Sequence, residues 1–298
     1  MRRLAILAIG LTPLAAPAFA DTPDIVPASM ILDTGAAQRV ESAELLRIYT
    51  QEVPAAACFY HNGIAPELSR ELLIEAHDGF ILHYNALLHG DEALGILEAE
   101  TRRKTIKELK DLDVHWSEMS KAVEDILAGT DMDHAFEVIA KHNLSLLDEA
   151  DHLVSVIQAE YSNPTELMQS DVLTIEIAGR LAVLTQRMVK NACKIRTGHA
   201  SDELTARLTE EIAHYELSLN ALLNGMPELG IQPAPTEETQ ELLREILADW
   251  AEVKPTILAS TEPDALSDAD MEYLFVHMEH EMHRAEDLTH AYVTASKH

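Results

Sequence analysis

The chain has 298 residues and is 47% hydrophobic, so it is long enough to bury one large core or two smaller ones. Only 5% of the residues are aromatic, and glycine and proline are few, a composition that favours helices over sheets. The formal net charge of -29 excludes nonspecific nucleic-acid binding and disfavours binding flat on an anionic membrane, because both need a basic surface. A small anion is compatible with this charge only in a local basic pocket.

The first 20 residues read MRRLAILAIGLTPLAAPAFA, a basic start followed by an apolar run that ends in small residues. This pattern predicts a secretory signal peptide over 1–20 with cleavage before Asp21, and a short N-terminal extension over 21–34. No later apolar run is long enough to span a bilayer. We therefore expect an exported protein, located in a bacterial periplasm.

An internal repeat appears when the sequence is shifted by 135 residues. The segment NALLHG at 85–90 matches NALLNG at 220–225, and the two cysteines, Cys58 and Cys193, obey the same offset. The register slips by one near Trp116 and Trp250 and returns toward the end of each copy. Matches that recur at one offset along the chain indicate an internal duplication.

Each copy is predicted to form four amphipathic helices, because apolar residues recur at spacings of three and four and turn residues separate the segments. Four such helices with short loops make an up-down bundle. The expected fold is therefore all-α, with two tandem four-helix bundles over 35–161 and 165–298. The expected helices cover residues 35–62, 66–90, 98–128 and 133–161 in the first copy and 165–197, 201–225, 236–260 and 267–295 in the second.

The first helix of the second copy contains IAGRLAVLTQRMVKNA, which resembles the opening helix of the PilJ/NarX-type sensor domain. That domain is the N-terminal module of type IV pili methyl-accepting chemotaxis transducers and of nitrate/nitrite sensor kinases, and its motif reads roughly A-G-x-x-R-M-x-S-x-R-M. The second copy keeps most of the motif but has Ala182 at the fifth position. The first copy has Arg47 at that position, with Glu44 in place of the glycine and Glu52 in place of the last arginine.

The resemblance implies a periplasmic sensor-type protein that binds a small anion such as nitrate or nitrite. In the family, two first helices meet and the arginine at the fifth motif position binds the anion. Because Ala182 replaces one of these arginines, a symmetric pair cannot form here, and Arg47 becomes the main binding charge. The candidate ligand-binding residues are Arg47, Thr50, Gln51, Thr185, Gln186, Arg180 and Arg187.

The residues themselves favour close packing of the two first helices. Small side chains recur along one face from Ala178 to Cys193, which lets another helix approach closely. If these helices pack together, Cys58 and Cys193 either form a disulfide or remain two buried free thiols. Pro54 is expected to kink or interrupt the first helix.

Two of these expectations have plainer alternatives. Arg47 could form an ion pair with Glu44 or Glu52 without any ligand, because a buried arginine needs a partner. Arg180 and Arg187 could be a solvated basic edge that pairs with nearby acids.

No pattern in the sequence indicates catalysis or a cofactor, so we expect a protein that is not an enzyme. Glu211 and His214 form a single Glu-x-x-His pair, which is too little for a di-iron bundle. The run HMEHEMH at 277–283 could bind copper or zinc, but three histidines at steps of three drift round a helix, and no metal ligand is assigned. No kinase or transducer segment follows, so any signal would pass to a separate partner. The alternatives are an interaction module for a pilus or receptor protein and a periplasmic metal-binding protein.

Overall fold

A computed structural model describes residues 35–161 and 169–296 of the chain. The expected signal peptide (1–20), the N-terminal extension (21–34) and residues 162–168, which include the start of the second expected bundle, lie outside these residues. None of the described helices combines the length and the apolar character that crossing a membrane requires.

The described residues form an all-α structure, as the sequence predicts, and the only β pairing among them consists of two isolated bridges. A short π-helical turn, Ile195–His199, extends the fifth helix, and a single 3-10 turn, Pro227–Leu229, precedes the seventh. The eight α-helices are α1 Ala36–His61, α2 Pro66–His89, α3 Arg103–Leu127, α4 Met132–Tyr161, α5 Gln169–Lys194, α6 Asp202–Asn224, α7 Glu237–Ala259 and α8 Asp268–Ala295.

Local chemistry explains several helix starts. Pro66 opens α2, where its missing N–H costs nothing. The side chains of Ser201, Thr236 and Ser267 each accept a hydrogen bond from a backbone N–H in the first turn of α6, α7 and α8. One expectation was wrong in detail, because helix α3 begins at Arg103 instead of 98. Of the two effects expected of Pro54, an interruption does not occur, since α1 continues through it from Ala36 to His61.

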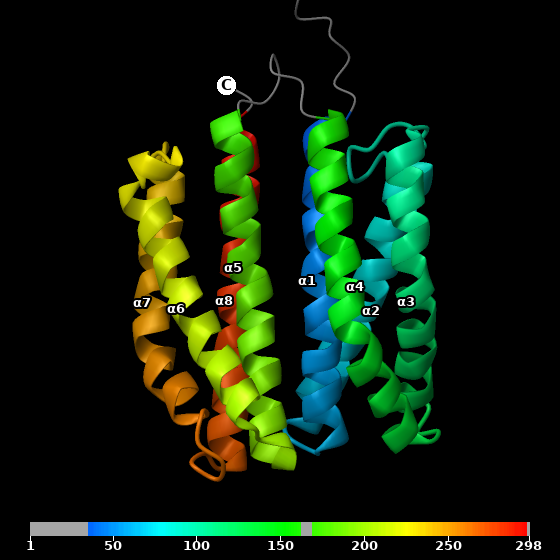
Figure 1. Cartoon of the computed structure of the whole chain (residues 1–298), viewed down its shortest axis with the longest axis vertical. Coiled ribbons are helices and arrows are strands. Elements are labelled where there is room, and N and C mark those ends of the chain that lie inside the picture. Colours follow the sequence, from blue (N-terminus) through cyan, green and yellow to red (C-terminus); the bar gives the residue numbers. More distant parts are fainter. Residues whose placement is uncertain (1–34, 162–168, 297–298) are drawn as a thin grey trace, which may run out of the picture. The chain divides into compact units, whose positions relative to one another are not determined.

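The helices pack as two groups that meet along α1 and α5 (Figure 1). In the first group α1 packs on α2 and α4, and α3 packs on α4. In the second group α5 packs on α6 and α8, and α7 packs on α8. Across the junction, the ring of Phe59 on α1 stacks on that of Phe275 on α8, with ring centroids 4.1 Å apart. A single buried apolar cluster runs through both groups.

The two groups repeat the same backbone conformations at positions separated by 135 residues. The bridge Asp91–Ile96 reappears as Met226–Ile231. Gly90, which ends α2 with a φ of 82°, corresponds to Gly225, which ends α6 with a φ of 76°. A positive φ at a helix end favours glycine, so the matched sequence positions carry the same local structural requirement.

Candidate functional site

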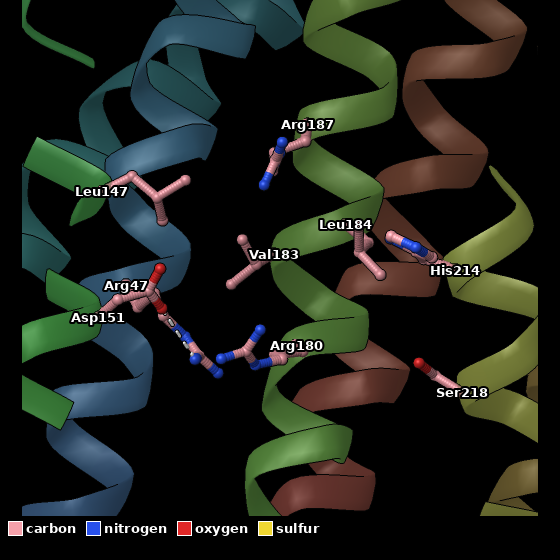
Figure 2. A pocket seen from close by; sticks show the side chains of 9 residues that line it. All are labelled: Arg47, Leu147, Asp151, Arg180, Val183, Leu184, Arg187, His214 and Ser218. Atoms are coloured by element: carbon pink, nitrogen blue, oxygen red, sulfur yellow. Dashed lines mark hydrogen bonds and ion pairs between the residues drawn. The ribbon is translucent and has the colours of Figure 1, made fainter. Parts of the chain in front are cut away.

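The junction of α1 and α5 holds three of the candidate ligand-binding residues around one pocket of about 220 Å³. Its lining comes from both helical groups, since α1 and α4 supply one side and α5 and α6 the other. Figure 2 shows the guanidinium groups of Arg47 and Arg180 pointing toward one another from α1 and α5. The residues that line the pocket are Arg47, Leu147, Asp151, Arg180, Val183, Leu184, Arg187, His214 and Ser218.

Arg47 is almost completely buried, with 1% of its surface exposed. It forms ion pairs with Glu44 one turn earlier on α1 and with Asp151 on α4, where Nη1 lies 3.1 Å from Oδ1. Its Nε is buried without a hydrogen-bond partner among the described residues. The ion-pair alternative therefore names one correct partner, Glu44, whereas Asp151 takes the place suggested for Glu52.

The place where Arg47 and Glu44 pack against α5 is Gly179. A Cβ atom at Gly179 would lie 2.6 Å from Glu44 Oε2 and 3.3 Å from Arg47 Nη2. The absence of a side chain at Gly179 therefore makes room for the buried ion pair. Ala182, the residue that aligns with Arg47 in the repeat, is fully buried one turn later on α5.

Arg180 and Arg187 are more exposed than Arg47 and have carboxylate partners of their own. Arg180 donates to Glu176 one turn earlier on α5, with Nη2 2.8 Å from Oε1. Arg187 reaches across to α6, where its Nη2 lies 2.7 Å from Oε1 of Glu211. Both pairs match the expectation of acids beside these arginines, yet both side chains also line the pocket.

Burial raises the pKa of Glu44 from its ordinary value to about 7, although the neighbouring Arg47 lowers it. Glu44 therefore takes up a proton at a higher pH than an exposed glutamate does. When Glu44 takes up a proton, Arg47 keeps its positive charge and loses one of its two negative partners. The positive potential in the pocket therefore rises as the pH falls through 7.

The other four candidate residues do not line the pocket. Thr50 and Thr185 are fully buried, and each donates its hydroxyl to a carbonyl in the preceding turn of its own helix. Gln186 donates to Glu279 on α8 at 3.0 Å. Gln51 accepts a hydrogen bond from Lys190, a residue that the sequence analysis did not single out.

Lys190 is a buried lysine between α1, α4 and α5. Its Nζ donates to Gln51 Oε1 and to Asn143 Oδ1, the latter at 3.0 Å. Burial lowers the pKa of Lys190 to about 7. One feature of the sequence could have pointed to this buried lysine: Lys190 aligns with Ala55, an apolar residue, in the first copy of the repeat.

Cys58 and Cys193 form a disulfide between the ends of α1 and α5. Both residues are buried and lie close to the C-terminal ends of their helices, so α1 and α5 run parallel at this point. The disulfide lies 11 residues along α1 from Arg47, which is about three helical turns.

The histidines of the 277–283 run do not converge. His277 Nδ1 donates to the carbonyl of Tyr273, and the ring of His280 lies 6.4 Å away. His283 is held between Glu279 and Glu286 on the same helix. Each of these histidines therefore has its own neighbours along α8.

Residues 165–272 match the family model described as the type IV pili methyl-accepting chemotaxis transducer N-terminal domain, PilJ. The match covers α5, α6 and α7 and the beginning of α8, and thus lies in the second helical group. It supports the resemblance of this region to a PilJ-like sensor domain. A search of curated proteins finds no match to the chain.

Proposed function

We propose that this protein is an exported, periplasmic sensor-type binding module that holds a small anion, of the nitrate or nitrite kind, in the pocket between α1 and α5. The observation that carries the proposal is the convergence of Arg47 and Arg180 from two different helices on one space (Figure 2). Two guanidinium groups that face one another repel, and an anion between them turns this repulsion into attraction.

The pocket also suits a small ligand in size and composition. A liquid water molecule occupies about 30 Å³, so a cavity of about 220 Å³ accommodates a compact oxyanion with a few waters. Val183, Leu147 and Leu184 supply apolar walls, which strengthen electrostatic interactions by excluding water. The net charge of -29 opposes anion entry, so binding depends on these local arginines.

We infer that residues 35–161 and 165–298 are duplicated PilJ-like bundles. The offset of 135 residues in the disulfide and in both bridges supports this interpretation. The pocket then occupies the place where two separate chains would meet in a dimer. Each half contributes different residues, because the position on α5 that aligns with Arg47 holds Ala182, and the facing arginine, Arg180, comes from another position. Signal output through a receptor or pilus-related partner belongs to the same proposal.

The experiment is a titration with sodium nitrate and sodium nitrite, followed by calorimetry and thermal shift against sodium chloride at equal ionic strength. The decisive variant is Arg180→Gln, because Arg180 is largely exposed and its loss leaves the buried ion pairs in place. We expect this substitution to weaken binding at least about tenfold, as expected for the loss of one charge-assisted contact.

The matched control is Arg207→Gln on α6. Arg207 pairs with Glu203 four residues earlier, as Arg180 pairs with Glu176, but it does not line the pocket. Glu44→Gln provides a second measurement, since it removes a competing negative charge and should strengthen binding at pH 8. Anion binding that survives Arg180→Gln unchanged overturns the site. No stabilisation by either anion favours a pure interaction module instead.

A further inference from the structure

The outer pair of helices in the first group, α3 and α4, brings two histidines together away from the pocket. His115 on α3 and His142 on α4 place their Nδ1 atoms 3.1 Å apart. Both side chains are partly buried, and their ring centroids lie 5.4 Å apart. Two nitrogens that point at each other at this distance share one proton in the absence of another partner.

The separation of the two nitrogens also fits a metal ion. Zinc binds histidine nitrogen at about 2.0–2.1 Å, and two nitrogens on one tetrahedral ion are therefore about 3.4 Å apart. The observed distance of 3.1 Å between the two Nδ1 atoms is slightly shorter than this value, and a small rotation of either ring makes up the difference. The pair therefore has the spacing of two ligands before a metal is added.

Charged residues lie on the same two helices as this pair. Lys141 precedes His142 directly in the chain, and Glu118 follows His115 by one turn on α3. Neutral imidazole is the form that binds a metal.

A second group on the same two helices provides a comparison. Glu108, Glu149 and His152 each offer one ligand atom within 4.8 Å of the others. Glu108 is already paired with Lys107, and the side chain of His152 is 71% exposed. A cluster of this kind, with one exposed member and acidic residues, is common without a metal, whereas both imidazoles of the His115–His142 pair are partly buried.

We infer that His115 and His142 form a binding site for a divalent transition-metal ion, of the copper, nickel or zinc class, that bridges α3 and α4. Imidazole nitrogen is a preferred ligand for each of these ions. Water completes the coordination. The ion replaces the shared proton and holds the two helices together at mid-length.

The test uses the full chain titrated with Cu²⁺ by calorimetry, with electron paramagnetic resonance as a direct count of nitrogen ligands. We expect one saturable site whose spectrum shows two coordinated nitrogens. His115→Gln and His142→Gln should each weaken binding about tenfold or more, because each removes a metal ligand. Zn²⁺ should compete with Cu²⁺ for the same site.

Two matched controls come from the same chain. His152→Gln removes the imidazole of the second group, and His277→Gln alters the position that aligns with His142 in the repeat. Both should bind Cu²⁺ like the unaltered protein, and circular dichroism should show equal helix content in all variants. A loss that follows His152→Gln or His277→Gln while His115→Gln binds normally overturns the site. Equal small losses in every variant indicate scattered surface binding and also overturn it.

Discussion

Removal of the disulfide offers the sharpest test of how the two helical groups are held together. The perturbation is the double substitution of Cys58 and Cys193 by alanine. Alanine suits both positions because they are buried and cysteine is itself a small residue. The bond closes a loop with a sequence separation of 135 residues. The chain-entropy relation for a loop of this length gives about 5 kcal/mol of stabilisation at 25 °C, through restriction of the unfolded chain.

The assay is equilibrium unfolding in guanidinium chloride, followed by far-ultraviolet circular dichroism. We expect the free energy of unfolding to fall by several kcal/mol, with about 5 kcal/mol as the upper range of the entropic effect. The unaltered protein treated with a reductant is the control, because it loses the bond while keeping both sulfur atoms. The difference between the reduced protein and the double variant then measures packing alone.

The expected result is that reduction accounts for most of the loss. If the reduced protein unfolds at the same denaturant concentration as the oxidised one, the loop-closure reasoning is refuted. A large loss in the double variant combined with no effect of reduction assigns the stabilisation to sulfur packing instead.

Two further results follow from the structure. Burial raises the pKa of Glu281 to about 7, so the folded state binds a proton that the unfolded state releases between pH 4.5 and 7. Stability should therefore rise as the pH falls from 7.5 to 5, by up to about 3 kcal/mol for such a group, and Glu281→Gln should flatten the melting-temperature profile over this range. Gly179→Ala should destabilise the protein by about 1–3 kcal/mol, because its Cβ would lie 2.6 Å from Glu44 Oε2. The same thermal melts measure it, and an unchanged melting temperature would show that the ion pair can move aside.

Much of the fold could be predicted because it depends on local patterns. Amphipathic periodicity placed seven of the eight helices within five residues of their observed ends, and the start of the remaining one, α5, falls beside undescribed residues. The small residues along α5 predicted that α1 and α5 pack together. The repeat identified Arg47 as an arginine that has no equivalent in the other half. These are consequences of spacing along one helix, which a sequence displays directly.

The rest of the site depends on packing between helices that are distant in the sequence. Asp151 becomes a partner of Arg47 only because α4 packs on α1, and His214 reaches the pocket only because α6 packs on α5. Thr50, Gln51, Thr185 and Gln186 lie on the helices that form the pocket, but their side chains are buried away from it. The motif could not show this, because it does not say which face of the helix each residue occupies. Glu44 stands where the motif has a glycine, and it is one of the two partners of Arg47 that the sequence offered as an alternative to a ligand.

The disulfide also has a mechanical consequence. A covalent bond near one end of two parallel helices prevents them from sliding past each other and leaves rotation about that end as the available movement. Arg47 is 11 residues from Cys58 and Ala36 is 22 residues from it, or about 16 Å and 33 Å along α1. A rotation of α1 about the cystine would therefore displace the first residue of α1 about twice as far as it displaces Arg47.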